Sequence, residues 1–312
     1  MRIVKYNPAV HKEDWNKFVA ESKNGTFLHH RNFMDYHSDR FSDSSFLFYD
    51  KGNLAAILPA NITDNILYSH QGLTYGGLIT NYDTKTADIL TIFQSLISYL
   101  QAEGVRQIIY KPVPQIYHKY PAEEDLYALY RYNAELKSRS VSSTIGLTTQ
   151  RPPYSQLRKR RIKKANQEGI TIQESEELNG FWEILNQNLQ ERHNTMPVHT
   201  LEEISSLKRK FPLQIRLFEA KKDSDIIAGC LVFETETVAH IQYISANHDG
   251  KQYGALDLLF DKLINETFTH KNYFDFGIST ENGGAYLNEG LISQKEGFGA
   301  RATIYDTYIL TI

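Results

Sequence analysis

Residues 226–245 read IIAGCLVFETETVAHIQYIS, a stretch with two apolar runs that are rich in β-branched residues. Such runs predict two neighbouring strands. Further along the chain, Ala255, Leu259 and Leu263 recur at the spacing of one helix face, and the sequence YFDFG at residues 273–277 predicts another strand. This part of the chain therefore favours a strand meander followed by a helix and a strand.

The same order of elements can be followed through both halves of the chain. In each half, two helices precede the meander, and a helix and a strand follow it. This is the order of the acetyltransferase (GNAT) fold, so we expect an α+β protein with two tandem GNAT-like domains, each a mixed sheet flanked by helices. The predicted segments are helices around Trp15 and Trp182 and over Asn32–Arg40 and Leu201–Lys210, and strands at 46–49, 54–60, 66–69, 107–111 and 214–220.

The length of the chain also indicates two domains. A sequence of 312 residues exceeds the usual range of one hydrophobic core, which favours two domains of roughly 150 residues. Pro152 and Pro153 interrupt regular structure between Ala134 and Arg158. We therefore place the first domain at residues 1–145 and the second at residues 146–312.

Composition excludes several classes of function. A net charge of −3 argues against general affinity for nucleic acids or membrane surfaces, and no DNA partner is expected. The single cysteine, Cys230, excludes an internal disulfide, and its apolar neighbours indicate a buried strand residue. Zinc-binding spacings are absent, so we expect no metal. Since no window approaches the ~18 apolar residues that span a bilayer and the N-terminus lacks a signal peptide, a cytoplasmic protein without an integral membrane segment is expected.

Four stretches carry a resemblance to a known family. Together they resemble the Fem-type (FemAB-like) aminoacyl- and acyltransferases, which have tandem GNAT domains and act on amines of cell-envelope precursors. The resemblance covers nearly the whole chain. The stretches are GTFLHHR at 25–31, SHQGLTYGGLI at 69–79, YSQLRKRRIKKA at 154–165, and FDFGIS at 274–279 together with QKEGFG at 294–299.

The first two stretches imply an acceptor site in the first domain. Glycines at positions 76 and 77 would let a ligand approach main-chain N–H groups closely. The alternatives are a capped helix at the first stretch and a plain glycine-rich turn at the second. The residues implied for binding the acceptor are His30, Arg31, Tyr75, Gly76, Gly77, Tyr82 and Asp83.

The third stretch is strongly basic. Six of the seven residues from Arg158 to Lys164 are Lys or Arg, in a chain that is otherwise slightly acidic. Such a cluster, with Arg158 and Arg161 as its candidate ligands, suits the phosphates of a nucleotide-linked envelope precursor or of a tRNA. The alternative is a solvated helix face.

The fourth stretch contains candidate catalytic residues. Lys295 matches the family lysine placed beside the acyl donor, whereas Gln294 departs from the aromatic residue frequent before it. No Ser-His-Asp or Cys-His arrangement is suggested, which favours direct attack of an amine on the donor without an acyl-enzyme. Asp275 and His70, with Asp83 as a further candidate, are then predicted to accept the proton of that amine.

The donor is expected in the second domain. Its loop at residues 249–255 partly matches the GNAT loop whose N–H groups bind a pyrophosphate, through Lys251, Gln252 and Gly254. Tyr243, on the strand before this loop, is a further candidate contact. We expect no tightly bound cofactor, and acyl-CoA or aminoacyl-tRNA as co-substrate.

Two hypotheses remain after these observations. The first is an acyl- or aminoacyltransferase that modifies an amine of a peptidoglycan or surface-polysaccharide precursor. The second is a catalytically idle double-GNAT module that binds an envelope precursor or a partner protein. Gln294 and the incomplete loop favour the second hypothesis, whereas Lys295 and the basic stretch favour the first.

Overall fold

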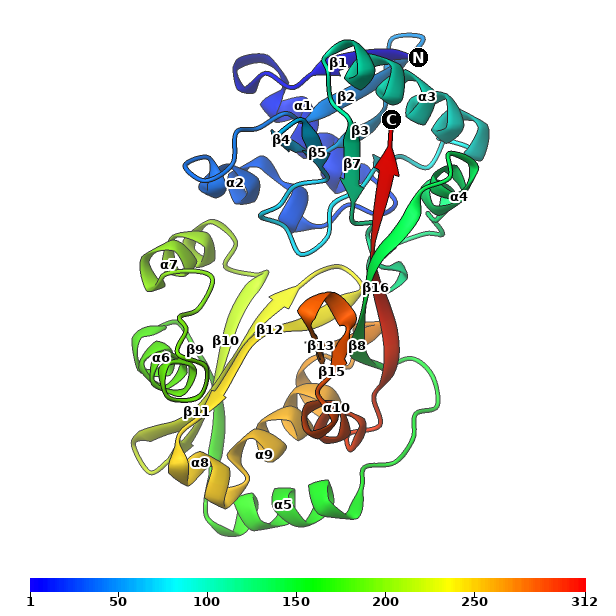
Figure 1. Ribbon diagram of the computed structural model, residues 1–312. Helices are drawn as coiled ribbons and strands as arrows, with labels where there is room; N and C mark the ends of the chain where they lie inside the picture. The colour runs from blue at the N-terminus through cyan, green and yellow to red at the C-terminus, as the bar shows by residue number, and fades with distance from the viewer. The chain divides into compact units, whose positions relative to one another are not determined.

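The computed structural model describes all 312 residues, apart from the side chains of His37, Arg192 and His193. The chain forms two compact units (Figure 1). Unit 1 contains Met1–Ser140, Glu281–Tyr286 and Ile304–Ile312, and unit 2 contains Val141–Thr280 and Leu287–Thr303. The predicted boundary between the two GNAT-like domains, after residue 145, stays a prediction. The units themselves divide after Ser140 and share the C-terminal segment.

Unit 1 contains two groups of strands. Strands β1, β2, β3 and β6 form an antiparallel sheet in that order, and β4, β5, β7 and the C-terminal part of β16 form a second, mixed group in which β5 and β7 are parallel. The bounds are β1 Arg2–Lys5, α1 Pro8–Glu21, α2 Arg31–Met34, β2 Phe46–Asp50, β3 Asn53–Leu58, β4 Asn61–Thr63, β5 Ile66–Tyr68, β6 Ile79–Thr80, α3 Thr86–Ala102, β7 Gln107–Tyr110 and α4 Glu124–Arg131.

Helix α3 shows why this unit folds as predicted. Its buried residues Ile89, Ile92, Phe93, Leu96 and Leu100 recur at intervals of three and four and form one apolar face. This face belongs to the hydrophobic core of the unit, to which buried residues of the strands also contribute. The helix starts where the Asp88 carboxylate accepts the main-chain N–H of Lys85 at 2.9 Å.

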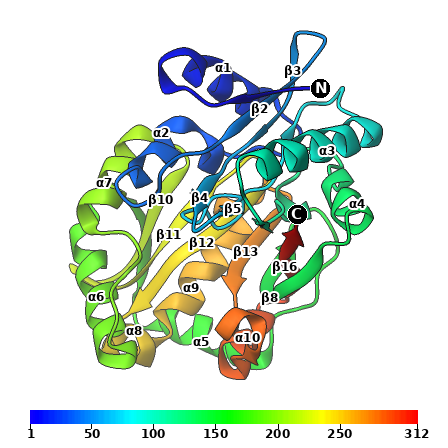
Figure 2. The same cartoon turned by 45° about the horizontal axis from the view of Figure 1, so that its top comes forward.

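Unit 2 contains one mixed sheet with the order β8-β13-β12-β11-β10-β9. Only β12 and β13 are parallel among its described pairs. Helix α6 packs on β11 and β12, and α9 packs on β10 and β11 (Figure 2). The bounds are β8 Glu135–Gly146, α5 Gln156–Gln167, β9 Thr171–Ser175, α6 Asn179–His193, α7 Leu201–Lys210, β10 Ile215–Lys222, β11 Asp225–Glu234, β12 Val238–Ala246, α8 His248–Tyr253, α9 Ala255–Lys262, β13 Tyr273–Ile278, β14 Thr280–Glu281, β15 Tyr286–Leu287, α10 Glu289–Glu296 and β16 Arg301–Thr311.

One arrangement is common to both units. The strand after the long helix lies beside the last strand of the meander, since β7 pairs with β5 and β13 pairs with β12. Both pairs are parallel, in sheets that are otherwise antiparallel at these positions. Each unit therefore has the same local arrangement, which positions the candidate site described next.

Among the described residues, no helix is both long enough and apolar enough to span a lipid bilayer.

Candidate functional site

The two parallel strands of unit 2 part after three residue pairs. Pairing of β12 with β13 ends at His240 and Asp275, although β12 continues to Ala246 and β13 to Ile278. A bulge at Gln242 shifts the register of β12 against β11 close to this point. Bulges of this kind redirect side chains next to functional sites. The end of the β12–β13 pairing is therefore the candidate site of unit 2.

Asp275 lies at the last paired position and is fully buried. Its Oδ1 accepts hydrogen bonds from Ser142 Oγ at 2.6 Å and from Thr144 Oγ1 at 2.9 Å, both on β8. Its Oδ2 lies 2.8 Å from His240 Nδ1. Burial by itself raises the pKa of Asp275, but the bonds from His240, Ser142 and Thr144 outweigh burial and lower the pKa below its usual value. The carboxylate is therefore ionised and acts as an acceptor only.

His240 is the residue that sequence reasoning missed. Because Asp275 can only accept, His240 Nδ1 carries the proton of that hydrogen bond, and the neutral imidazole then has its basic lone pair at Nε2. The His240 side chain is 13% exposed, whereas Asp275 is not exposed at all. In the sequence, His240 differs from its neighbours only as a polar residue between Ala239 and Ile241. The structure alone shows that it is in register with Asp275.

Lys295, the residue that the resemblance places beside the acyl donor, lies beside the same strand end, and its role there stays a prediction. Its Nζ donates to the main-chain oxygens of Gly277 and Ile278, both at 2.8 Å. Gly277 has a φ of 76°, a left-handed conformation that glycine adopts without strain. Burial lowers the pKa of Lys295 to about 8, although the nearby Asp275 charge opposes this. An ammonium has three N–H donors, so one remains beyond the two carbonyls.

The predicted donor residue Tyr243 lies on β12 beyond the point where the strands part. Its hydroxyl is 2.6 Å from His199 Nδ1, and its ring meets Trp182 edge to face at 5.3 Å. Burial raises the pKa of Tyr243, although bonds to its hydroxyl oppose this, so the phenol stays protonated at neutral pH. Tyr243 is thus held in place by α6 and by the segment before α7.

The other predicted donor residues already have partners within unit 2. Lys251 Nζ donates to Asn188 Oδ1, and the main-chain oxygen of Lys251 accepts from Arg161 Nη2. The main-chain oxygen of Gln252 accepts from Lys164 Nζ at 3.0 Å. A Cβ at Gly254 would lie 2.9 Å from the Arg161 oxygen, so this glycine is required for close packing of α5. These contacts give the loop a structural role and weaken the support for a pyrophosphate there.

The predicted phosphate ligands Arg158 and Arg161 are also engaged. Arg158 is buried, and its Nη1 lies 2.5 Å from Asp257 Oδ1, while Arg161 Nε lies 3.2 Å from Asp257 Oδ2. Removing either guanidinium would leave a buried carboxylate partly unpaired. Both arginines therefore hold α5 within unit 2, and their role in binding phosphate stays a prediction.

The glycine-rich stretch of unit 1 is folded against its own strand. A Cβ at Gly76 would lie 1.9 Å from the Ser69 oxygen, and the Gly76 N–H donates to the oxygen of Lys111 at 3.0 Å. Gly77 packs against Tyr110, whose hydroxyl accepts the N–H of Leu78 at 2.6 Å. The N–H groups of Gly76 and Leu78 thus have partners within unit 1, and the role of this loop in binding the acceptor stays a prediction.

The two other predicted site residues of that stretch, Tyr75 and His70, are both buried. Tyr75 is buried, donates to Thr26 Oγ1 at 3.3 Å and packs on Tyr117. His70 is buried with a φ of 64°, and its Nδ1 accepts the N–H of Gly72 at 3.2 Å. His70 belongs to unit 1, whereas Asp275 and Lys295 belong to unit 2. Its role as a proton acceptor stays a prediction.

The first motif of unit 1 builds a helix start. His30 Nδ1 accepts the N–H of Asn32 at 3.1 Å and caps α2, and burial lowers the pKa of His30. Arg31 is buried between the rings of Tyr6 and Trp15, with its guanidinium 3.4 Å and 3.9 Å from their centroids. The same guanidinium pairs with Asp43 at 2.5 Å. Arg31 therefore has a structural role in the core, whatever its role in binding.

Tyr82 and Asp83 lie in the turn before α3. Tyr82 is 57% exposed and lies near Tyr120, with ring centroids 5.8 Å apart. The N–H of Asp83 donates to Asn81 Oδ1 at 3.1 Å. Both side chains are thus available to a ligand, and their predicted role in binding the acceptor stays open to test.

The described part of the chain offers neither a cluster of metal ligands nor a reactive cysteine. No three His, Cys, Asp or Glu side chains among the described residues are grouped as a metal site would need. Cys230 is fully buried, and burial raises its pKa well above the usual value, so the thiol is not a nucleophile at neutral pH.

Comparison with known proteins identifies the fold. A family model described as an acetyltransferase (GNAT) domain matches residues 155–286. No curated protein matches the sequence significantly.

Solved structures resemble the whole chain at low sequence identity. The crystal structure of FemX has a TM-score of 0.71 at 10% identity and covers 100% of this chain and 98% of its own. The C-terminal domain of a lysylphosphatidylglycerol synthetase from Agrobacterium fabrum has a TM-score of 0.63 at 12% identity, with 97% and 92% covered. A tandem GNAT protein from the clavulanic acid pathway has a TM-score of 0.53 at 8% identity, with 99% and 98% covered. Residues 155–286 therefore match a GNAT domain model, and the chain has, over its full length, the fold of FemX and of tandem GNAT proteins.

Proposed function

We propose that the chain is an N-acyltransferase or aminoacyltransferase that acts on an amine of a cell-envelope precursor. The observation that carries this proposal is the His240–Asp275 pair at the point where β12 and β13 part, with Lys295 at the end of β13. The GNAT match over residues 155–286 supports acyl transfer, and it includes both members of the pair.

The proposed reaction is a direct transfer. The acceptor amine attacks the donor carbonyl carbon and forms the new C–N bond, while its proton passes to His240 Nε2. The tetrahedral intermediate then expels the thiol or the hydroxyl of the donor, which takes the proton from the imidazolium. Asp275 keeps the imidazole in the tautomer that can accept a proton and stabilises the imidazolium.

Lys295 is proposed to stabilise the oxygen of the tetrahedral intermediate. Two of its N–H groups are held by the Gly277 and Ile278 oxygens, and the third can donate to the donor carbonyl. With a pKa of about 8 the amine is mostly protonated at pH 7. The same pKa predicts that turnover falls when the pH rises above about 8, because the charge is then lost.

The proposed co-substrates are an acyl or aminoacyl donor and an envelope precursor as acceptor. GNAT domains use acyl-CoA, whereas the resemblance to Fem-type proteins keeps aminoacyl-tRNA as the second candidate donor. That resemblance also motivates a peptidoglycan or surface-polysaccharide precursor as the acceptor. A structural neighbour named as a lysylphosphatidylglycerol synthetase supports an aminoacyl group as cargo.

The test compares wild type with His240→Ala and Asp275→Asn in a transfer assay, using acyl-CoAs and aminoacyl-tRNAs with a panel of amine acceptors. His240→Ala should lower kcat by about 10²- to 10⁴-fold, the usual contribution of a general base. Circular dichroism and thermal unfolding control for folding. If His240→Ala keeps wild-type turnover, this mechanism is wrong.

The alternative of a catalytically idle binding module makes a different prediction. It is favoured by Gln294 and by the internally paired loop around Lys251. In that case wild type transfers nothing from any donor, while it still binds an envelope precursor. Transfer that depends on His240 would exclude the alternative.

A further inference from the structure

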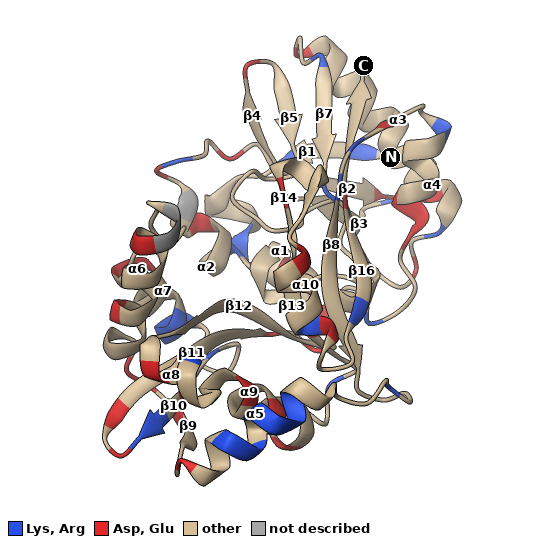
Figure 3. Cartoon of the chain, turned by 60° about the horizontal axis from the view of Figure 1, so that its bottom comes forward, with Lys and Arg blue, Asp and Glu red and all other residues tan. Residues whose placement is uncertain are grey.

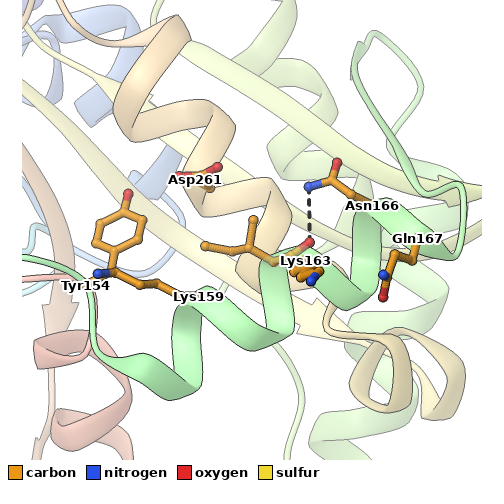
Figure 4. Close-up of a pocket in the computed structure, with 7 residues that line it drawn as sticks. Tyr154, Lys159, Lys163, Asn166, Gln167 and Asp261 are labelled. Carbon is orange, nitrogen blue, oxygen red and sulfur yellow. Dashed lines mark hydrogen bonds between the residues drawn. The ribbon is translucent and has the colours of Figure 1, made fainter.

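Two surface pockets lie along helix α5, and the residues that line both belong to unit 2. The first, of about 580 Å³, lies between α5 and α9 (Figure 4). Its phenol and its carboxylate are both engaged by one amide, since Asn265 Nδ2 donates to Tyr154 Oη at 3.1 Å and to Asp261 Oδ1 at 2.6 Å. The exposed Lys159 and Lys163 remain, within the run of basic residues along α5 in Figure 3. Positive charge by itself does not select a ligand.

The second pocket, of about 700 Å³, lies where the start of α5 meets the end of α10. The main-chain N–H of Ser155 donates to the Gly297 oxygen at 2.8 Å, which joins the two helices there. A Cβ at Gly297 would lie 3.2 Å from Ser155 Oγ, so the glycine permits this close approach. The volume falls within the range of small-molecule sites, roughly 300–1,000 Å³. We call it the α5–α10 pocket, and its walls include Leu157, Arg158, Ser293, Gln294, Glu296 and Arg301.

Two opposite charges line the α5–α10 pocket without pairing with each other. Glu296 and Arg301 are both exposed, and neither takes part in an ion pair among the described side chains. Arg301 Nη1 donates to the Ala300 oxygen at 2.6 Å, which leaves the rest of its five N–H donors for a ligand. The Glu296 carboxylate accepts no hydrogen bond from the described residues, so its lone pairs are also available.

The buried wall of the pocket carries an excess of positive charge. Arg158 is buried, lines the pocket and shares the Asp257 carboxylate with Arg161, at 2.5 Å from Oδ1 and 3.2 Å from Oδ2 respectively. Because two guanidinium groups share one carboxylate, that carboxylate compensates only one of their charges. The Arg158 side of the pocket, together with Arg301, therefore favours a carboxylate, whereas Glu296 favours an ammonium.

The neutral groups of the pocket complete the contacts that a small ligand needs. Ser293 and Gln294 line it without a side-chain hydrogen bond to any described residue, and the amide of Gln294 both donates and accepts. Leu157 is 47% exposed and provides an apolar surface. A lone anion would be repelled by Glu296 and a lone cation by Arg301, so the pocket favours a ligand that carries both charges.

We propose that the α5–α10 pocket binds a free α-amino acid with an aliphatic side chain, with the ligand carboxylate at Arg301 and the ligand ammonium at Glu296. An α-amino acid carries the two charges close together and brings an apolar group for Leu157. A short peptide carries the same two charges further apart and serves as the competing ligand in the test. The site is independent of the proposed transferase function, since His240, Asp275 and Lys295 do not line it.

The experiment measures binding of L-leucine, N-acetyl-L-leucine, L-leucinamide and the dipeptide leucyl-leucine to the full chain by isothermal titration calorimetry. L-leucine should bind at least about tenfold more tightly than either blocked derivative, because each derivative loses one charge-assisted contact. Arg301→Gln should weaken L-leucine by at least about tenfold and leave L-leucinamide unchanged, and Glu296→Gln should weaken L-leucine equally and leave N-acetyl-L-leucine unchanged. Arg160→Gln and Glu289→Gln remove the same charges from exposed positions of the same two helices outside the pocket, and both should bind like wild type.

Each outcome decides the proposal. A preference for L-leucine that depends on both Arg301 and Glu296 supports the site. No binding of L-leucine at about 10 mM, equal binding of all ligands, or equal effects of the pocket and control variants would overturn it. Tighter binding of leucyl-leucine than of L-leucine would also overturn it, in favour of a peptide. Circular dichroism checks that each variant is folded. Because binding is measured without turnover, the pocket can fail while the His240 mechanism holds, and the reverse.

Discussion

The described parallel pairs β5–β7 and β12–β13 each pair at three positions but have different surroundings. In unit 1, β5 and β7 pair at three positions and end with Tyr68 opposite Ile109. Ser69 then closes the space between the strands, since its N–H donates to the Ile109 oxygen at 2.9 Å and its Oγ accepts the Lys111 N–H at 2.8 Å. In unit 2, the equivalent pair ends with His240 opposite Asp275.

The difference bears on which unit would carry the proposed chemistry. The last pair of unit 1 contains a tyrosine and an aliphatic residue, whereas that of unit 2 contains an imidazole and a carboxylate in hydrogen-bond contact. The same backbone arrangement thus holds a closed turn in one unit and a titratable pair in the other. This contrast supports catalysis in unit 2, with unit 1 in another role.

Each unit also contains one lysine near this position, half-buried in unit 1 and buried in unit 2. Lys111 follows β7 and donates to the Leu73 oxygen in the glycine-rich loop, and Lys295 donates to two oxygens at the end of β13. Burial lowers the pKa of both lysines to about 8. The two lysines therefore have similarly lowered pKa values but different neighbours. Lys295, unlike Lys111, lies near a carboxylate that is hydrogen-bonded to a histidine.

Removing the two lysines in turn should give the largest contrast. Lys295→Met should lower kcat by about 10²- to 10³-fold, because a donor to the developing oxyanion is lost. Lys111→Met should change kcat by less than about threefold and act on stability and KM, since Lys111 holds the loop at Leu73. Steady-state kinetics from pH 6 to 9 measure both variants.

The pH profile provides the control for this comparison. If Lys295 acts as an ammonium, the fall of kcat above about pH 8 disappears in Lys295→Met and persists in Lys111→Met. Equal losses of kcat in the two variants would mean that the two sites do not differ as proposed.

The buried aspartates of the two units should respond to pH in opposite directions. Burial raises the pKa of Asp125, in contact with Tyr110, to about 6, although that contact opposes the rise. Folded protein therefore binds more protons than unfolded protein between about pH 4 and 6, and the Asp125 contribution to the free energy of unfolding falls as pH rises through this window. The pKa of Asp275 is lowered, so its contribution is present above about pH 4 and is lost as pH falls below that value.

Urea unfolding of two variants at pH 4 to 7 measures this effect. Asp125→Asn should be more stable than wild type at pH 7 by up to about 3 kcal/mol and similar to it at pH 4, because a buried charge is removed. Asp275→Asn should be less stable than wild type at pH 7, since the donors from Ser142, Thr144 and His240 lose their carboxylate. A shift of the same sign at pH 7 in both variants would contradict the assignment.

The serines beside the two strand pairs should give the smallest contrast. Ser142→Ala removes one of the donors to Asp275 and should lower kcat a few-fold, with the imidazole held less firmly. Ser69→Ala leaves the Lys111 N–H without its acceptor and should cost about 1–3 kcal/mol of unfolding free energy, with kcat unchanged. Kinetics and thermal unfolding of both variants separate the two effects, and the reverse pattern would argue against the division between the units.

Local sequence pattern determined much of the fold. The apolar face of α3 and the apolar runs of β10 to β12 depend on residues a few positions apart, and such patterns can be read from the sequence itself. The repeated order of elements predicted β7 and β13, the strands that follow the long helix of each half. The same order, with the four motifs, indicated the FemAB-like fold and put Lys295 and Asp275 forward together.

Partners distant in sequence were decided only by the tertiary structure. His240 is a candidate site residue because strand pairing places it in contact with Asp275, 35 positions away. A single polar residue in a strand does not reveal that pairing. Arg158 looked like a free cation until the fold placed it on Asp257, 99 positions away. The C-terminal strand β16 was likewise assigned to one domain, yet it contributes to both units. Local periodicity fixes which residues are buried in an element, whereas strand register and ion pairing depend on which elements meet, and that is settled by the packing of the whole chain.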